Sequence, residues 1–214
     1  ITGAIPVFLM PTRNHYGIIG PIPLEEFRWE NIERKIAANP FAREAKRRPR
    51  ILTITQSTYD GVSYNVETIK EMLDGRIDTL HFDEAWLPHA AFHDFYGDYH
   101  AIGEGRAPCV DSMIFSTQST HKLLAGLSQA SQILVQDSLH QKLDRDVFNE
   151  AFLMHMSTSP QYAIIASCDV AAAMMEPPGG TALVEESILE ALDFRRAMRK
   201  VDAELEESWW FKVW

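Results

Sequence analysis

The residues of this chain that could do chemistry fall in three polar clusters, each placed where an apolar, strand-like run ends. Residues 59–61 (YDG) follow the first run, Asp83 and Glu84 end the second, and residues 119–122 (STHK) follow the third. One polar turn after a strand is common. Three in corresponding places predict a single site, because ligands collect outside the carboxyl ends of parallel strands.

Asp83 is distinctive because apolar residues lie on both sides of it in the stretch LHFDEAW, residues 80–86. A carboxylate that is buried without a partner is costly in free energy. We therefore expect Asp83 to be buried and to meet a cation or a hydrogen-bond donor.

A lysine and a carboxylate on neighbouring strand ends match the needs of pyridoxal 5'-phosphate. The amine of Lys122 would form a Schiff base with the cofactor aldehyde, and Asp83 would keep the pyridine nitrogen protonated so that the ring accepts electrons. Ser119, in the turn that opens the next helix, would be placed to hold the phosphate. By spacing alone, Lys122 equally fits an ordinary surface lysine, since most lysines are exposed.

The same region offers an alternative, a metal-dependent hydrolase. His81, His89 and His93 lie close to Asp83 in the sequence, and His89 and His93 have the spacing of two ligands on a helix. A proline and several aromatic residues around them are more typical of a solvated loop, so we expect no metal. Cys168, among small apolar residues, reads as a buried structural thiol rather than a nucleophile. A catalytically silent assembly module on the same fold is a third class that one sequence leaves open.

Apolar runs and helical periodicity alternate along the chain, which predicts an α/β fold with a mainly parallel sheet flanked by helices. Strands are expected over residues 51–57, 79–85, 112–118 and 131–137, and helices over residues 65–75, 145–156, 161–175 and 183–205. Asn65 is a candidate N-cap and Gly75 a candidate stop, so the first helix would connect the first two strands as a β-α-β unit.

Composition narrows the class of protein further. Among 214 residues, 46% are hydrophobic and 23% charged, which is enough apolar material for a full core. The net charge of −10 repels nucleic acid and anionic membranes, and no run of roughly 18 apolar residues occurs, so we expect neither as a partner. The basic run at residues 43–50 reads as a solvated connection. Two cysteines are too few for a disulfide framework and fit the reducing cytoplasm.

The amino-acid sequences of several stretches resemble those of one family. They are ITGAIPVFLMPTRNHYGIIGPI (residues 1–22), STYDGVSYN (57–65), HFDEAW (81–86), STQSTHKLLAGLSQAS (116–131), MSTSPQYAIIAS (156–167) and SWWFKVW (208–214). They are similar to the bacterial acid-inducible arginine, lysine and ornithine decarboxylases, which have the aspartate aminotransferase fold. The likeness covers residues 1–214 and implies a segment of the cofactor-binding major domain. We expect further N-terminal and C-terminal parts, because the family's upstream phosphate loop and ring-stacking histidine have no counterpart here.

The resemblance implies roles for individual residues. In the family, the lysine of the Ser-Thr-His-Lys element carries the cofactor, which makes Lys122 the Schiff-base residue. The matching Ser119 and His121 would contact the cofactor phosphate or its surroundings, and His121 joins Lys122 and Asp83 in the expected catalytic set. In the Asp-x-Ala-Trp element, Asp83 would pair with the pyridine nitrogen. The same resemblance has Ala85 packing on a face of the ring, Trp86 lining the site, and Ser157 reaching the phosphate of a neighbouring subunit.

The resemblance also implies a reaction and an assembly. The expected activity is decarboxylation of a basic amino acid, arginine or lysine, to agmatine or cadaverine and CO2. The opening stretch and HFDEAW lean toward the arginine branch of the family. Family members form homodimers with active sites at the subunit boundary, and a decamer is the expected larger assembly.

Overall fold

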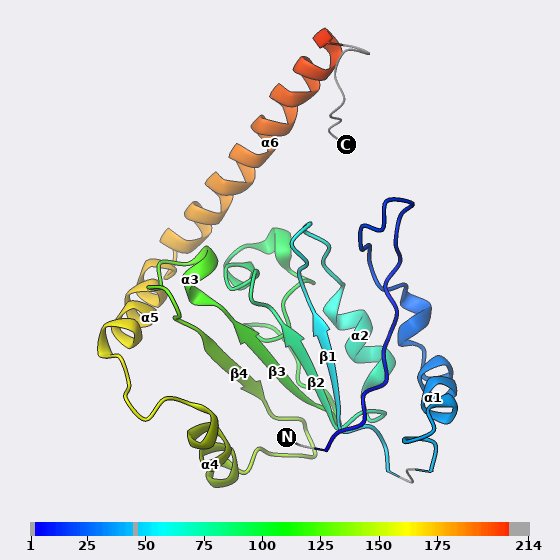
Figure 1. The fold of residues 1–214 in the computed structure, drawn as a ribbon. Coiled ribbons are helices and arrows are strands. Elements are labelled where there is room, and N and C mark those ends of the chain that lie inside the picture. The colour runs from blue at the N-terminus through cyan, green and yellow to red at the C-terminus, as the bar shows by residue number, and fades with distance from the viewer. Residues whose placement is uncertain (1–2, 45–46, 206–214) are drawn as a thin grey trace.

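A four-stranded sheet forms the centre of the computed structural model, which describes residues 3–44 and 47–205. Its strands are β1 (Ile51–Thr55), β2 (Thr79–Asp83), β3 (Met113–Gln118) and β4 (Gln132–Gln136), in the spatial order β1-β2-β3-β4. The first three are parallel and β4 is antiparallel to β3 (Figure 1). All four lie within the predicted runs, and the sheet is mainly parallel as expected.

The described helices are the short 3-10 helices η1 (Leu24–Phe27), η2 (Ala90–Phe92) and η3 (Asp94–Tyr96), and the α-helices α1 (Trp29–Ala38), α2 (Val66–Leu73), α3 (Thr120–Leu123), α4 (Arg145–His155), α5 (Tyr162–Met174) and α6 (Gly179–Leu205). Four helices, α2, α4, α5 and α6, match the predicted positions, whereas α1 was not predicted. Helix α6 extends away from the sheet (Figure 1). It begins at Gly179, four residues before its predicted start.

The crossover helix α2 shows why the N-cap, the apolar spacing and the glycine were sufficient to predict this helix from the sequence. The side chain of Asn65 accepts a hydrogen bond from the backbone N–H of Thr68, which caps the helix start. Val66, Ile69 and Leu73 are fully buried on one face. The chain then leaves the helix through Gly75, whose positive φ of 71° suits glycine.

The direction of β4 was not predicted. A parallel return needs a crossover of about a dozen residues or more that carries the chain back to the starting end of the sheet. The connection from Gln118 to Gln132 instead makes the α3 turn at one end of the sheet, and Gln118 pairs directly with Gln132. The strand therefore runs antiparallel.

The hydrophobic core lies between the sheet and helices α1 and α2. Leu80 and Phe82 of β2 and Ile114 of β3 are fully buried in one cluster with the apolar residues of α2. These strand residues are two apart, so they point to the same face of the sheet. His81, Asp83 and the other intervening residues must point to the opposite face.

The basic run between α1 and β1 is an exposed connection, as expected, in its described part. Arg48 and Arg50 both form ion pairs with Asp78, at 2.9 and 3.2 Å. The aromatic segment 208–214 lies outside the described residues. Within the described chain, no helix combines the length and the apolar character needed to cross a membrane.

Two isoleucines of β1 give a matched test of this core. Ile54 is 2% exposed and Ile51 is 56% exposed. We expect Ile54→Ala to lower the free energy of unfolding by about 2–5 kcal/mol, because it leaves a cavity among packed side chains. Ile51→Ala should cost only about 0.5 kcal/mol. Denaturant unfolding of both variants measures the difference, and equal losses would contradict the placement of the core.

Candidate active site

The two sequence motifs predicted to form the site meet through Lys122 and Trp86. Trp86 lies in the turn after β2, and Lys122 lies in α3, directly after β3. The Nζ atom of Lys122 lies over the Trp86 ring, 4.6 Å from its centroid. An ammonium at this distance from an indole face is attracted by the ring quadrupole. The lysine is therefore held over the carboxyl ends of two neighbouring strands and not directed into bulk solvent.

The third polar cluster joins them through Tyr59. Its ring makes an edge contact with Trp86, with 5.3 Å between the ring centroids. A cavity of about 340 Å³ lies beside this pair. Trp86 and Tyr59 line it together with hydroxyl side chains and neighbouring residues, namely Ser57, Thr58, Gly61, Ser63, Leu87, His89, Tyr96 and Leu123. Trp86 thus brings members of the three strand-end clusters together at one end of the sheet.

Asp83 is not the buried acid that its apolar neighbours suggested. It is only partly buried, and one carboxylate oxygen accepts a hydrogen bond from the backbone N–H of Ala85 at 3.2 Å. The fully buried carboxylate is Glu84. The reason is strand alternation: Phe82 points into the core, so Asp83 points to the other face of the sheet. A partly exposed carboxylate on this face can reach a ligand, whereas a buried one cannot.

Backbone and side-chain contacts fix the turn that carries Lys122. The backbone N–H of His121 donates to the carbonyl of Ala130 at 3.2 Å, and His121 Nδ1 lies 2.7 Å from the same oxygen. A Cβ at Gly126 would come within 3.1 Å of the Thr120 carbonyl, so glycine allows the loop to pass close to the helix. Ser119 is the N-cap of α3 but its side chain makes no capping hydrogen bond. His121 thus holds the turn in place through Ala130.

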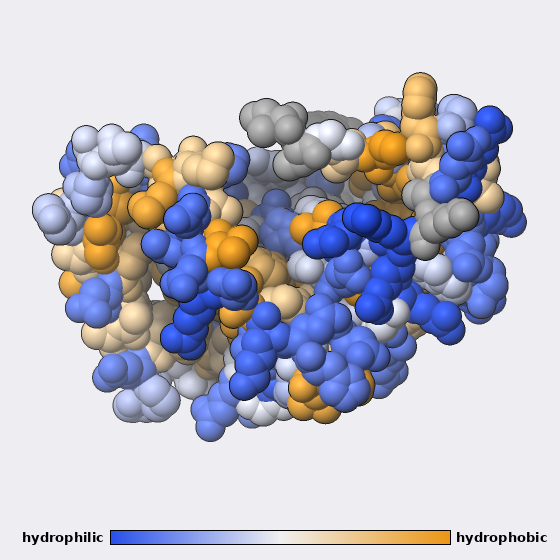
Figure 2. Space-filling model, turned by 90° about the horizontal axis from the view of Figure 1, so that it is seen from below, coloured by the Kyte–Doolittle hydropathy of each residue, from blue (hydrophilic) through white to orange (hydrophobic). Residues whose placement is uncertain are grey.

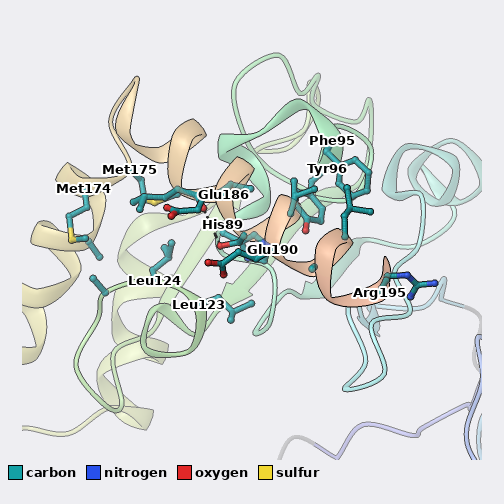
Figure 3. A pocket seen from close by; sticks show the side chains of 18 residues that line it. His89, Phe95, Tyr96, Leu123, Leu124, Met174, Met175, Glu186, Glu190 and Arg195 are labelled. Carbon is teal, nitrogen blue, oxygen red and sulfur yellow. Dashed lines mark hydrogen bonds between the residues drawn. The ribbon is translucent and has the colours of Figure 1, made fainter. Parts of the chain in front are cut away.

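A second, larger cavity of about 760 Å³ lies next to the site, between the α3 loop and α6. Figure 3 shows Leu123 and Leu124 beside it, with Glu186 and Glu190 of α6 facing the same space. Its lining is largely apolar and lacks Trp86, and neither lining includes Lys122 or Asp83. We place the candidate active site beside the smaller cavity because Trp86, which lines it, carries the Lys122 amine over its ring.

A comparison with protein families assigns the whole chain. The family model described as "Orn/Lys/Arg decarboxylase, major domain" matches residues 1–214. The chain belongs to this decarboxylase family. Lysine decarboxylase LdcA of Pseudomonas aeruginosa is 54% identical over the full chain, and the biodegradative arginine decarboxylase of Escherichia coli is 44% identical.

Solved decarboxylase structures share the fold. Lysine decarboxylase A from Pseudomonas aeruginosa matches 99% of this chain with a TM-score of 0.89 and 54% identity. The constitutive lysine decarboxylase of Escherichia coli matches 97% with a TM-score of 0.84 and 42% identity. The chain spans only 28% and 29% of the length of the two curated relatives named above, and 28% and 27% of the two solved chains.

One residue that the family resemblance implied lies apart from the rest. Ser157 is exposed in the connection between α4 and α5, where its hydroxyl oxygen accepts from the backbone N–H of Ser159 at 3.1 Å. This connection passes the outer side of β4 on its way from α4 to α5 (Figure 1). The described hydrogen bonds of Ser157 stay within the connection and do not reach the cluster around Lys122.

The histidines of the metal alternative do not converge either. His81 lies on β2, whereas His89 and His93 flank the three-residue helix η2, so the expected helical spacing of two ligands does not occur. His93 instead pairs with Glu185 of α6 at 2.6 Å. Across residues 3–44 and 47–205, no group of three or more His, Cys, Asp or Glu side chains is placed to hold a metal ion.

The sequence reasoning did not single out the buried polar network behind the site. Glu84 contacts Ser116 and Gln118 of β3, and all three are buried. A signal was present: Ile114, Ser116 and Gln118 alternate along one strand, so two polar residues occupy core-facing positions. Polar groups at such positions require partners.

His81 gives a prediction about pH. Its ring nitrogens lie 3.3 Å from Thr53 Oγ1 and 3.0 Å from Thr117 Oγ1, and burial lowers the pKa of His81 below the ordinary value of 6.5, although nearby Asp83 acts to raise it. Below about pH 6.5 the unfolded state therefore binds more protons at His81 than the folded state does. The free energy of unfolding consequently decreases as the pH falls below this value. We expect the melting temperature of the wild type to fall more steeply from pH 7 to pH 5 than that of His81→Asn.

The comparison between variants is needed because other groups titrate in the same range. Burial raises the pKa of Glu84, which acts with the opposite sign, and burial lowers the pKa of His89 and His100. These contributions are common to the wild type and to His81→Asn, so the difference in slope isolates His81. Parallel melting curves for the two proteins would contradict the prediction.

Proposed function

We propose that this chain forms the cofactor-binding part of a pyridoxal-phosphate-dependent enzyme that decarboxylates a basic amino acid. The observation that carries the proposal is the placement of Lys122 over Trp86 at the end of β3, beside the strand end that presents Asp83. In a member of the Orn/Lys/Arg decarboxylase family, this is the combination of amine, aromatic ring and carboxylate that the chemistry needs.

The residues present fit pyridoxal phosphate. Lys122 supplies the amine that attaches to its aldehyde, Asp83 supplies a partly exposed carboxylate, and the adjoining cavity has hydroxyl groups from Ser57, Thr58 and Ser63. When bound, the cofactor provides an electron sink for the carbanion left after loss of CO2. The site also lacks the convergent side chains that a metal-dependent hydrolysis would need within the described residues.

Each side chain then has a defined task. Lys122 would hold the cofactor covalently through its amine. Asp83 would keep a proton on the pyridine nitrogen, because a carboxylate next to that nitrogen favours its cationic form. Trp86 and Ala85 would border the ring, and His121 keeps the Lys122 turn in position through Ala130. Ser119 is the N-cap of α3, the helix that carries Lys122, and we assign it to the surroundings of the phosphate.

We infer the substrate class from the names of the relatives. We rank the candidate substrates by the sequence identity of each relative to this chain. The proteins that match this chain include lysine, arginine and ornithine decarboxylases. We place L-lysine first because LdcA of Pseudomonas aeruginosa is 54% identical, and L-arginine second because the arginine decarboxylase is 44% identical. This order differs from the lean of the opening stretch and of HFDEAW toward arginine.

The test is a parallel assay of the intact protein with added pyridoxal phosphate. Release of CO2 is measured from L-lysine, L-arginine and L-ornithine under the same conditions. We expect turnover with one of the basic amino acids and the formation of its amine, cadaverine for lysine or agmatine for arginine. No CO2 from any of the three, or bound zinc without any bound cofactor, would overturn the proposal.

We also propose a homodimer as the functional unit, with a decamer as the larger assembly. Apolar side chains are exposed over α4 and α5, among them Leu153, Met154, Tyr162 and Ile165, and Figure 2 shows apolar surface on this side of the molecule. Ser157 lies between these helices, where it would reach a neighbouring subunit and not its own site. Cys109 and Cys168 are free thiols, which is compatible with our assignment to the cytoplasm. Mass measurement of the intact protein in solution tests the assembly.

A further inference from the structure

The carboxylate of Glu84 is fully buried directly next to Asp83, and the proposed chemistry does not use it. Three donors surround it. Oε1 accepts from the backbone N–H of Ala101 at 2.6 Å, and Oε2 accepts from the hydroxyl of Ser116 at 2.6 Å and from the side-chain amide of Gln118 at 2.9 Å.

Burial and hydrogen bonding act in opposite directions on this carboxylate. Burial is the larger effect and raises the pKa of Glu84, whereas the three hydrogen bonds and the nearby Lys70 act to lower it. Lys70 is 4% exposed, and its Nζ donates to the carbonyl of Ala101 at 2.8 Å and pairs with Glu67 at 3.0 Å. A buried carboxylate of this kind is retained only where its hydrogen bonds are satisfied.

The contacts of Glu84 join the ends of the two strands that carry the site. Its backbone N–H donates to the carbonyl of Thr117 at 2.9 Å, one residue beyond the last β2–β3 pair. Its carbonyl accepts from Leu87 at 2.8 Å and closes the turn that contains Ala85 and Trp86. Its side chain binds Gln118, the residue directly before Ser119, and the carbonyl oxygen of the Gln118 side chain accepts from Gln132 of β4 at 2.7 Å.

We propose that Glu84 is a positioning residue: its carboxylate, held by Ser116 and Gln118, fixes the segment Asp83–Trp86 relative to the segment Ser119–Lys122. The inference rests on the proposed function, because it assigns Asp83 and Lys122 to opposite ends of one bound cofactor. Those two groups come from different strands, so the spacing between them depends on what joins the strand ends. A misplacement of about 1 Å costs roughly 100-fold in rate at sites of this kind.

Substitution of two buried serines, one in β3 and one directly before it, can distinguish a positioning role of Glu84 from a purely structural one. Ser112 and Ser116 are both fully buried, and each donates its hydroxyl to a buried acceptor: Ser112 to the carbonyl of Ile77 at 2.7 Å, and Ser116 to Glu84 at 2.6 Å. Ser112 immediately precedes the start of β3, at the opposite end from Lys122. Ser116→Ala removes one donor to the carboxylate and should fold, whereas Glu84→Ala leaves three buried donors without an acceptor.

The experiment compares Ser116→Ala, Glu84→Gln and Ser112→Ala in the intact protein. The measurements are melting temperature, kcat, KM, the affinity for pyridoxal phosphate, and the visible circular dichroism of the bound cofactor, which reports its orientation. We expect all three variants to lose stability. Ser116→Ala and Glu84→Gln should in addition lower kcat by roughly 10-fold to 100-fold and change the dichroism. Ser112→Ala should keep kcat and the dichroism of the wild type.

The possible outcomes distinguish this inference from the proposed function. If the wild type turns over a basic amino acid and Ser116→Ala behaves like Ser112→Ala in kcat and dichroism, the positioning role is wrong and the proposed function stands. If the wild type releases no CO2 and binds no cofactor, both fail. A loss in Ser116→Ala and Glu84→Gln that is confined to melting temperature would also overturn the inference.

Discussion

Lys122→Ala is expected to abolish the proposed CO2 release from a basic amino acid, with a loss on the order of 10³-fold or more in kcat. The physical reason is that alanine has no amine to hold the cofactor or to be displaced by the substrate. The same variant loses the cofactor label that borohydride reduction fixes at position 122, which mass spectrometry of the peptide detects. Lys122→Arg keeps the positive charge over Trp86 and is expected to fail in the same way.

The matched control is Lys142→Ala, because Lys142 is an exposed lysine that lies in no helix or strand and outside the site. It should keep wild-type turnover and the label at position 122. Normal turnover in Lys122→Ala, or a borohydride label at another lysine of the wild type, would refute the assignment of Lys122.

Asp83→Ala is expected to bind the cofactor and yet lose roughly 10²-fold to 10³-fold in kcat, the range seen when one electrostatic group of an active site is removed. Without the carboxylate, the pyridine nitrogen loses the partner that favours its protonated form, and a neutral ring accepts electrons poorly. Asp83→Asn should behave similarly, since it keeps the shape and removes the charge. Turnover and bound cofactor are measured on the same preparation.

Asp146→Asn serves as the control for Asp83, because Asp146 is an exposed acid in the first turn of α4. It should leave both kcat and cofactor content unchanged. Wild-type kcat in Asp83→Ala would show that another group protonates the ring, and a complete loss of cofactor would show that Asp83 acts in binding and not in the electron sink.

Local signals in the sequence were sufficient for most of the fold. The N-cap Asn65, the apolar period of Val66, Ile69 and Leu73, and Gly75 define α2 because capping, amphipathic spacing and a glycine stop act within one or two turns. The strands were found for the same reason, since a short apolar run bounded by turns carries its own signature. The direction of β4 was beyond such signals because it depends on where the α3 turn leaves the chain.

The site divides in the same way. Lys122 and Trp86 were placed at strand ends by their neighbours in sequence, but their contact depends on β2 and β3 lying side by side. The prediction for the two adjacent acids was wrong. Asp83 was expected to be buried, but the buried carboxylate is that of Glu84.

By itself, the sequence determined most of the secondary structures and predicted which residues they present to the candidate site, because helix caps, apolar periods and sequence motifs depend on neighbours a few positions apart. Only the tertiary structure decided which of two adjacent carboxylates faces the cavity and which is enclosed. That choice depends on Ser116 and Gln118, more than thirty residues further along the chain, whose donors reach Glu84 only when the two strands pair. Adjacent residues of a strand face opposite sides of a sheet, and the pairing across the sheet decides which side is the core.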